Sequence, residues 1–245
     1  MPELADVYVP AVLTLAAFVH GLFGFGFPML ATPLLALGMA LPAAIQLTLL
    51  PTIATNLGSI AGEPGRGEAL RRFWPIPVFT FIGSFTGTQI LLTVDPEPFR
   101  LLLGAVLASY LLAERLPGVA RERRVPRWGL ALLGLGMGLL AGVVNIFGPV
   151  IIIFALYTRM PATLMVAAFN LSFVTSKTGQ LAGFAARGAL DLSLIGQTLW
   201  LLPLVLAALW LGIRLRRRIR PADYQRLLRL GLWALVAALV WDVVR

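Results

Sequence analysis

The stretch Gly21-Leu22-Phe23-Gly24-Phe25-Gly26-Phe27-Pro28 interrupts an apolar run that would otherwise cross a membrane without a break. Its glycines lack the Cβ atoms that restrict the backbone, and Pro28 suits the first turn of a new helix. The stretch therefore predicts a helix, a break and a second helix beginning at Pro28. A related stretch follows 121 residues later, Gly142-Val143-Val144-Asn145-Ile146-Phe147-Gly148-Pro149. In a bilayer, irregular backbone persists only where protein or a watery cavity surrounds it, so two such breaks predict one shared binding site.

The composition identifies an integral membrane protein. Hydrophobic residues make up 59% of the 245, charged residues make up 13%, and the mean hydropathy is +0.88. A soluble domain has about 25% charged residues. The chain has no cysteine and one histidine, which excludes disulfides, thiolate chemistry and multi-histidine metal sites, and no cofactor is expected. Since Glu3 and Asp6 occupy the first nine residues and no lysine or arginine does, no cleavable signal is expected.

The net charge of +9 is explained by membrane topology. Three segments between apolar runs carry clustered arginines, which places them in the cytoplasm, while Asp95 and Glu97 mark an external loop. Nucleic acid is therefore not an expected partner. We expect a multi-pass protein of the cytoplasmic (cell inner) membrane. The clustered residues are Arg66, Arg71, Arg72, Arg115, Arg121, Arg123, Arg124, Arg127, Arg214, Arg216, Arg217, Arg218, Arg220, Arg226 and Arg229.

The apolar runs divide into two sets of five. Runs 28–40 and 149–159 are too short to cross a hydrocarbon core of about 30 Å, and each predicts the returning half of a hairpin whose tip is a break. The fold class is therefore an all-α integral membrane protein with two repeats, each a re-entrant hairpin followed by three transmembrane helices. The other runs are 7–22, 43–62, 75–93, 98–113, 128–142, 162–186, 192–213 and 226–244.

Residue matches at the same offset support an internal repeat. The segment from Gly58 to Gly67 resembles the segment from Gly179 to Gly188, at the separation that relates Pro28 to Pro149. Counting membrane crossings from the arginine-rich loops gives the two halves opposite orientations, which is an inverted repeat. The predicted division is a first repeat at 1–116, a basic linker at 117–127 and a second repeat at 128–245. The alternative has eight simple spans with kinks, and it moves Arg214 to Arg220 to the outer face.

These motifs resemble the sulfite exporter TauE/SafE family of membrane transporters over about residues 10–244. The resemblance rests on the G-x-x-G-x-G-x-P stretch with Pro33-Leu34-Leu35 and on the G-x-x-A-G-x-x-x-R-G elements, whereas Asn145-Ile146-Phe147-Gly148 departs from the family's glycine-rich turn. It implies transport of small anions such as sulfite, or organosulfonates such as sulfoacetate, with 2-oxo carboxylates as the alternative. A membrane enzyme or an assembly subunit is the competing class, and a homodimer remains one open arrangement.

The residues themselves also point to an anion. The helices beginning at Pro28 and Pro149 would direct unpaired amides at the two breaks. Lys177 is the chain's one lysine and lies deep within run 162–186, where a cation is costly and is usually paired or functional. Since no carboxylate is expected within the spans, we expect Lys177 to be the counter-ion of an anionic substrate; the alternatives are that it reaches an interface or is neutral and hydrogen-bonded. The expected substrate-binding residues are His20, Gly24, Phe25, Gly26, Asn56, Asn145, Phe147, Gly148, Asn170, Ser176 and Lys177.

Ion coupling is left open by the sequence. All eleven aspartates and glutamates fall in loops or at span ends, so the simplest driving force is the anion's own gradient and the membrane potential. A proton carried on the substrate or on His20, which titrates near physiological pH, is the other possibility.

Overall fold

The computed structural model describes residues 2–61, 65–95, 102, 105, 125–148, 150, 151, 154, 158, 160 and 162–216. Within these residues the chain is helical and contains no strand. The helices are α1 (Pro2–Phe23), α2 (Phe27–Ala36), α3 (Leu41–Ala61), α4 (Arg66–Phe73), α5 (Pro75–Thr93), α7 (Arg127–Val144), α9 (Ala162–Ala186) and α10 (Leu192–Arg216).

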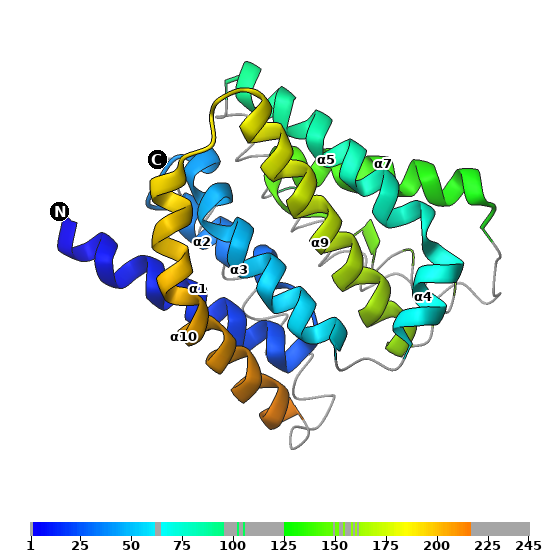
Figure 1. Ribbon diagram of the computed structural model, residues 1–245, viewed down its shortest axis with the longest axis horizontal. Coiled ribbons are helices and arrows are strands. Elements are labelled where there is room, and N and C mark those ends of the chain that lie inside the picture. The colour runs from blue at the N-terminus through cyan, green and yellow to red at the C-terminus, as the bar shows by residue number, and fades with distance from the viewer. Residues whose placement is uncertain are drawn as a thin grey trace.

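The helices form two groups that meet along α3 and α9 (Figure 1). One group contains α1, α2, α3 and α10, and the other contains α4, α5, α7 and α9. Each has its own buried apolar cluster, one around Leu13, Leu35 and Leu47, the other around Met137, Phe169 and Phe173. Each half of the chain thus lends one long helix to the other, because α10 packs on α1 and α5 packs on α7.

Both sequence breaks are breaks in the structure. The first is left-handed at Gly24 (φ 80°) and Gly26 (φ 100°), and the second is left-handed at Asn145 (φ 64°). After the first break, α2 has ten residues, a length of about 15 Å that cannot span a bilayer. The hydroxyl of Tyr8, early in α1, donates to the carbonyl of Leu34, late in α2, so α2 returns alongside α1 as the predicted first hairpin requires. The predicted return of the second hairpin, 149–159, lies largely outside the described residues.

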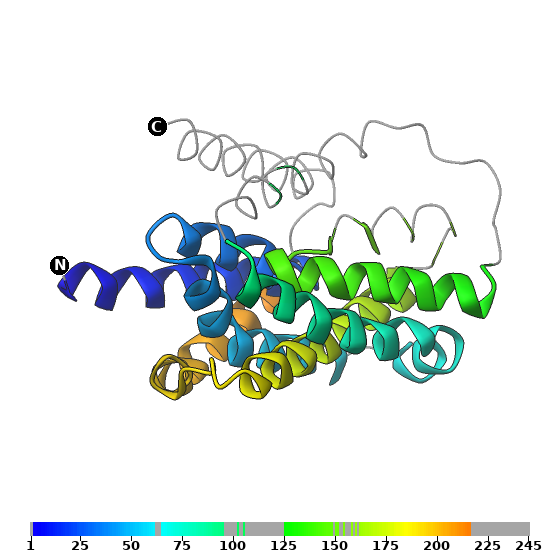
Figure 2. The same ribbon diagram turned by 90° about the horizontal axis from the view of Figure 1, so that it is seen from above.

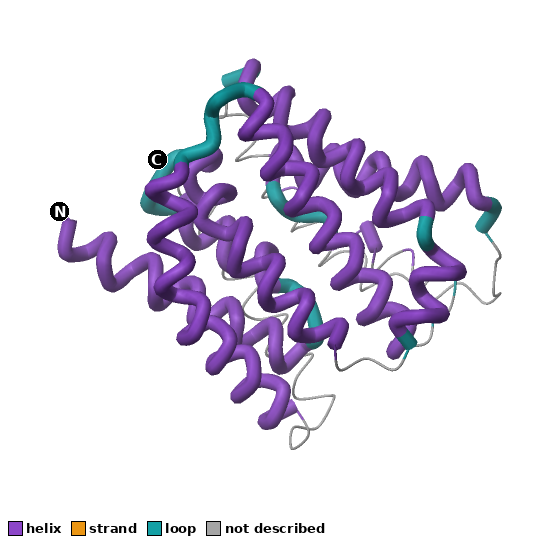
Figure 3. Tube along the Cα trace, viewed as in Figure 1, coloured by secondary structure: helices purple, strands orange, loops and turns teal. Residues whose placement is uncertain are grey.

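The two breaks are equivalent in detail at an offset of 121 residues. The amide of Gly24 donates to the carbonyl of His20 (2.6 Å), and the amide of Asn145 donates to that of Ala141 (2.8 Å). Figure 2 shows α1 and α7 entering from opposite ends of the long axis and ending near its middle. Figure 3 shows both breaks inside the helical bundle and not at its ends.

The equivalent helices α3 and α9 run antiparallel. The side chain of Gln46, near the start of α3, donates to the carbonyl of Ala189 (3.2 Å) and accepts from the amide of Asp191 (2.7 Å), both just beyond the end of α9. This course supports the predicted inverted repeat. The repeat stays a prediction for runs 98–113 and 226–244 and for most of linker 117–127, which lie outside the described residues apart from Leu102 and Ala105.

Glycines set the two helix crossings between the halves. A Cβ at Gly21 of α1 would lie 2.2 Å from the carbonyl oxygen of Leu209 in α10, and a Cβ at Gly142 of α7 would lie 2.5 Å from that of Ser84 in α5. The helices approach this closely because neither backbone carries a side chain at the crossing, as is common in membranes. Gly21 and Gly142 are themselves 121 residues apart.

A substitution pair on α7 tests the close crossing. A Cβ at Gly138 would lie 2.4 Å from the carbonyl oxygen of Thr80, whereas a Cβ at Gly136 would meet nothing within 4 Å. We expect Gly138→Ala to lower the free energy of unfolding by about 1–3 kcal/mol, because α5 and α7 must separate. Gly136→Ala should be neutral or slightly stabilising, because alanine favours a helix. Thermal unfolding in detergent measures both, and equal effects would contradict the close crossing.

Four described helices, α3, α5, α7 and α10, are long and apolar enough to cross a membrane. The bounds of α5 and α9 coincide with the predicted runs 75–93 and 162–186. The sequence analysis missed α4, a short helix with Ala69 and Phe73 buried and its arginines exposed. We expected a charged loop here, because only two residues of this segment, Ala69 and Phe73, form an apolar face.

Candidate functional site

The site is built along α9, which contacts both breaks. Its buried face carries Asn170, Phe173, Lys177 and Gln180, spaced three or four residues apart so that they line one side of the helix, with Phe169 beside Asn170. Phe169 and Asn170 contact the first break, and Phe173 and Lys177 contact the second.

The first break is held by Asn170 and His20. The side-chain amide of Asn170 donates to the carbonyl of Gly24 (2.7 Å), and the ring of Phe25 meets that of Phe169 edge to face with centroids 5.4 Å apart. The Nδ1 of His20 accepts from the amide of Phe27 (3.3 Å). The ring proton must then sit on Nε2, which donates to the hydroxyl of Ser59 (2.9 Å).

His20 therefore caps the start of α2. The amide of Phe27, the first residue of α2, is bonded to His20 and so is not available to a substrate. Both ring nitrogens have partners within the protein, which favours a positioning role for His20.

Removing the imidazole tests that role. We expect His20→Leu to lower the free energy of unfolding by about 1–3 kcal/mol, since a helix cap is lost and a buried amide and hydroxyl lose their partner. Anion affinity should change by no more than about threefold. Unfolding and anion binding are measured on the same sample, and lost binding with unchanged stability would contradict a positioning role.

The second break is held by Asn145. Its Nδ2 donates to the hydroxyls of Thr32 in α2 (2.6 Å) and Thr48 in α3 (2.8 Å), and its Oδ1 accepts from the Nζ of Lys177. Asn145 thus ties the second break to both first-half helices and to α9. Next to it, the ring of Phe147 stacks on Phe173 with centroids 4.2 Å apart.

Lys177 lies at the centre of this network, with an exposure of 1%. Its Nζ donates to the Oδ1 of Asn145 and to the Oε1 of Gln180. The amide of Gln180 in turn donates to the carbonyl of Ala141 (2.7 Å), which fixes the orientation of the Gln180 oxygen. Lys177 therefore has two hydrogen-bond partners, and both of them are neutral amides.

Within the described residues, Lys177 forms no ion pair. The carboxylates of that part of the chain lie in α4 or in loops and helix ends, as Glu68, Asp95 and Asp191 illustrate. An ammonium group has three N–H donors, and two are used by the amides. One donor and the charge itself remain available to a bound anion.

The second break contacts α2, the helix that follows the first break. A Cβ built on Gly148 would lie 2.2 Å from the sulfur of Met29, so the residue that begins the second return is in direct contact with the first turn of α2. This contact places the second break beside α2, and the predicted meeting of the two breaks stays a prediction.

Several buried polar atoms in this region have no hydrogen-bond partner within the described residues. The side-chain amide of Asn56 donates to the carbonyl of Thr52 (2.7 Å), which leaves its Oδ1 free. Buried polar atoms normally have partners, so free ones mark a place for a ligand or water. The free atoms are Thr52 Oγ1, Asn56 Oδ1, Asn170 Oδ1 and Ser176 Oγ.

Two sets of contacts along α9 hold most of the predicted site residues: Gly24, Phe25 and Asn170 at the first break, and Asn145, Phe147 and Lys177 at the second. No hydrogen bond among the described residues joins the side chain of Asn56 or Ser176 to either set. The same contacts include Thr32, Thr48, Phe169, Phe173 and Gln180, which were not predicted. Gln180 could have been found, because it lies three residues after Lys177 on one helix face. Other polar side chains of the spans have structural partners: they bond to backbone or, for Gln89, also to Arg187. These residues are Gln46, Thr86, Thr88, Gln89, Ser172, Thr175 and Thr178.

A search of the described residues finds no cluster of three His, Asp or Glu side chains that could hold a metal ion. The hydrogen-bond donors at the site are the ammonium of Lys177 and the side-chain amide of Asn145. Such a set suits an anion better than a cation, because it supplies hydrogens and positive charge.

Apolar spanning helices, helix breaks within the bundle and a buried cation bonded to one of the breaks are typical of membrane transporters. A family model agrees: the sulfite exporter TauE/SafE model matches residues 9–239, and the chain belongs to this family. It is therefore a multi-pass membrane transporter of small anions and not an enzyme. Searches for similar curated proteins and for similar solved structures find no match.

Proposed function

We propose that the protein carries a small sulfur-containing anion, such as sulfite or a sulfonate, by alternating access around Lys177 and the two breaks. The observation that carries the proposal is the environment of Lys177, a buried cation whose partners are neutral amides, one of them on a break. A buried cation without a counter-ion is unfavourable, and a bound anion supplies that counter-ion.

The substrate-binding residues in this proposal have distinct roles. Lys177 supplies the charge, and Ser176 supplies a free hydroxyl. Gly24, Phe25 and Gly26 form the first break, and Phe147 and Gly148 belong to the second. Asn56, Asn145 and Asn170 orient the breaks and present amide groups, while His20 positions α2.

Movement of one break relative to the other would expose the site to each side in turn. Asn145 is suited to this step because its bonds to Thr32 and Thr48 join the second break to the first half. An anion at Lys177 would compete with Asn145 Oδ1 for the ammonium, and so weaken the bond that holds Asn145 and the second break to α9. Substrate binding and break movement would thereby be linked.

The coupling proposal follows from the absence of buried carboxylates among the described residues. We infer that the anion's own gradient and the membrane potential drive transport, so that a negative interior favours exit from the cytoplasm. Protons would enter only if the substrate itself carries one.

The testing experiment is flux from proteoliposomes loaded separately with sulfite, sulfoacetate, a 2-oxo carboxylate and, as control, a monovalent cation. An imposed potassium diffusion potential, negative inside, should accelerate anion efflux, and a pH step at constant potential should not. Selective flux of the 2-oxo carboxylate would show that the substrate is a carboxylate and not a sulfur-containing anion. Flux of the cation would contradict an anion-binding site at Lys177.

A further inference from the structure

The two breaks differ in their access to the surface. Phe25 and Gly26 of the first break are partly exposed, and a Cβ at Gly26 would meet nothing within 4 Å. At the second break, the equivalent Ile146 and Phe147 both have an exposure of 0%. The comparison is between equivalent positions, because Ile146 and Phe147 follow Phe25 and Gly26 at the offset of 121 residues. The first break is open and the second is closed.

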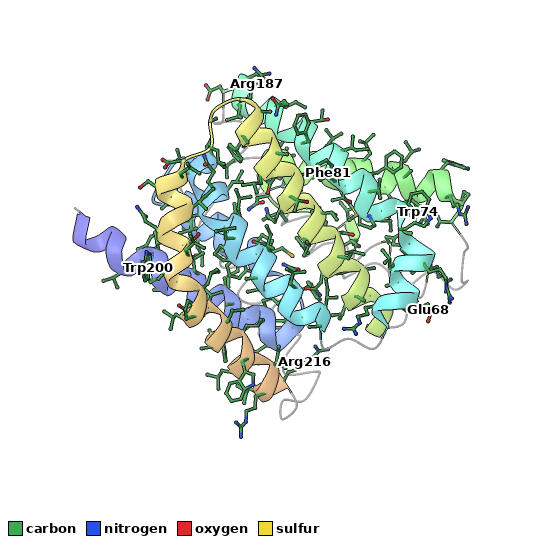
Figure 4. All side chains as sticks on the ribbon, viewed as in Figure 1. Glu68, Trp74, Phe81, Arg187, Trp200 and Arg216 are labelled. Carbon is green, nitrogen blue, oxygen red and sulfur yellow. The ribbon has the colours of Figure 1, made fainter. Side chains whose placement is uncertain are left out.

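A cation stands beside the open break. Arg216 is the last residue of α10, and a Cβ at Gly24 would lie 3.1 Å from its Nη1. Its side chain is exposed, so the guanidinium meets both the surface and the break. Figure 4 shows Arg216 at the end of the molecule opposite to Arg187.

The neighbouring arginine has a different environment. Arg214 is also exposed, but its guanidinium lies over the ring of Trp210, 5.2 Å from the centroid. Arg214 therefore shares the charge and the helix end of Arg216 without its contact to the break.

We propose that Arg216 and the Gly24–Gly26 break form the mouth through which the anion reaches Lys177 from the cytoplasm, with Arg216 as the residue that attracts it. This inference rests on the proposed function, because the anion that enters is the transported substrate. The path runs from Arg216 to Gly24, whose carbonyl is bonded to Asn170, and then along the polar face of α9 to Lys177 two turns further on. A fixed cation at a narrow entrance raises the local concentration of anions. The cytoplasmic side follows from the arginines at this end.

Access is tested by thiol labelling, because the chain has no cysteine of its own. Phe25→Cys and its matched control Ile146→Cys are treated with a membrane-impermeant maleimide in inverted and in right-side-out vesicles. We expect Phe25→Cys to react in inverted vesicles alone and Ile146→Cys to react in neither until the protein is denatured. If Phe25→Cys does not fold, Arg216→Cys places the thiol at the same mouth. A thiol at the mouth that reacts only in right-side-out vesicles, or in neither, would overturn the proposal.

The role of Arg216 is tested by reagent charge. In the Phe25→Cys protein, Arg216→Gln should slow an anionic methanethiosulfonate about threefold or more and accelerate a cationic one, as expected for a unit charge removed at about 6 Å in water. Arg214→Gln should change neither rate by as much. A structural effect would move both reagents in the same direction, and this result, or equal effects of the two arginines, would overturn the role of Arg216. Labelling needs no transport, so a protein that labels as expected but carries no sulfur anion refutes the proposed function alone.

Discussion

Replacing Lys177 with methionine is expected to abolish saturable anion transport while the protein remains folded. Methionine keeps most of the length of the side chain and removes the charge and all three N–H donors. A hydrogen bond to a charged group contributes about 1.5–3 kcal/mol, so anion affinity should fall by about ten- to a hundredfold or more. Flux from proteoliposomes and thermal unfolding in detergent, measured on the same preparation, give the two results.

Arginine at the same position is the matched comparison. Lys177→Arg keeps the charge but brings a larger planar group into a site with an exposure of 1%. We expect weakened but measurable anion binding, intermediate between wild type and Lys177→Met. Undiminished transport by the methionine variant would show that the charge of Lys177 is not needed for transport.

Replacing Asn145 with aspartate should inactivate the site in the opposite way, by supplying a permanent counter-ion. The carboxylate would stand where Oδ1 now accepts from Lys177 and would neutralise its charge. Aspartate tolerates the left-handed backbone of Asn145 (φ 64°), and the hydroxyl of Thr32 can turn to donate to it, whereas the hydroxyl of Thr48 already donates to the carbonyl of Ile45 (2.7 Å). We expect anion affinity to fall at least as far as in Lys177→Met, with stability unchanged or increased, as measured by calorimetric binding and thermal unfolding.

The neutral control for this substitution is Asn145→Gly. Glycine also accepts the left-handed conformation and makes the second break like the first, which has Gly24 at the equivalent place. It removes the bonds to Thr32 and Thr48, so stability should fall by about 1–3 kcal/mol, while Lys177 keeps its charge and anions still bind. Stronger anion binding by the aspartate variant than by the glycine variant would show that charge at Lys177 does not attract the substrate.

The breaks and spans were predictable from sequence because hydrocarbon imposes a strict rule on backbone. A glycine- and proline-rich interruption such as Gly24 to Pro28 cannot be continuous helix, and a ten-residue helix such as α2 cannot span. The repeat could be recognised because Gly21 and Gly142 occupy equivalent positions. Each lies at a helix crossing where a side chain would clash with the backbone of the other helix. These features depend on local chain properties, which a sequence displays.

Contacts between the halves were not predictable in the same way. Nothing local to Thr32 or Thr48 indicates that both accept from Asn145, about a hundred residues away in sequence. The capping of Phe27 by His20 was missed because the short path across the break depends on the left-handed turn at Gly24 and Gly26. Such bonds follow from the packing of α10 on α1 and of α5 on α7, which hydropathy does not encode.

The central claim is that an anion binds at the ammonium group of Lys177, and the chain offers a direct test because it contains no other lysine. Labelling the protein with lysine that carries ¹⁵N at Nζ gives a single side-chain ammonium resonance, which can be followed by solid-state NMR in lipid as sulfite is added. The account predicts one resonance that shifts saturably with sulfite and does not shift with a matched concentration of added cation. A resonance that stays in place while the protein transports sulfite would contradict it.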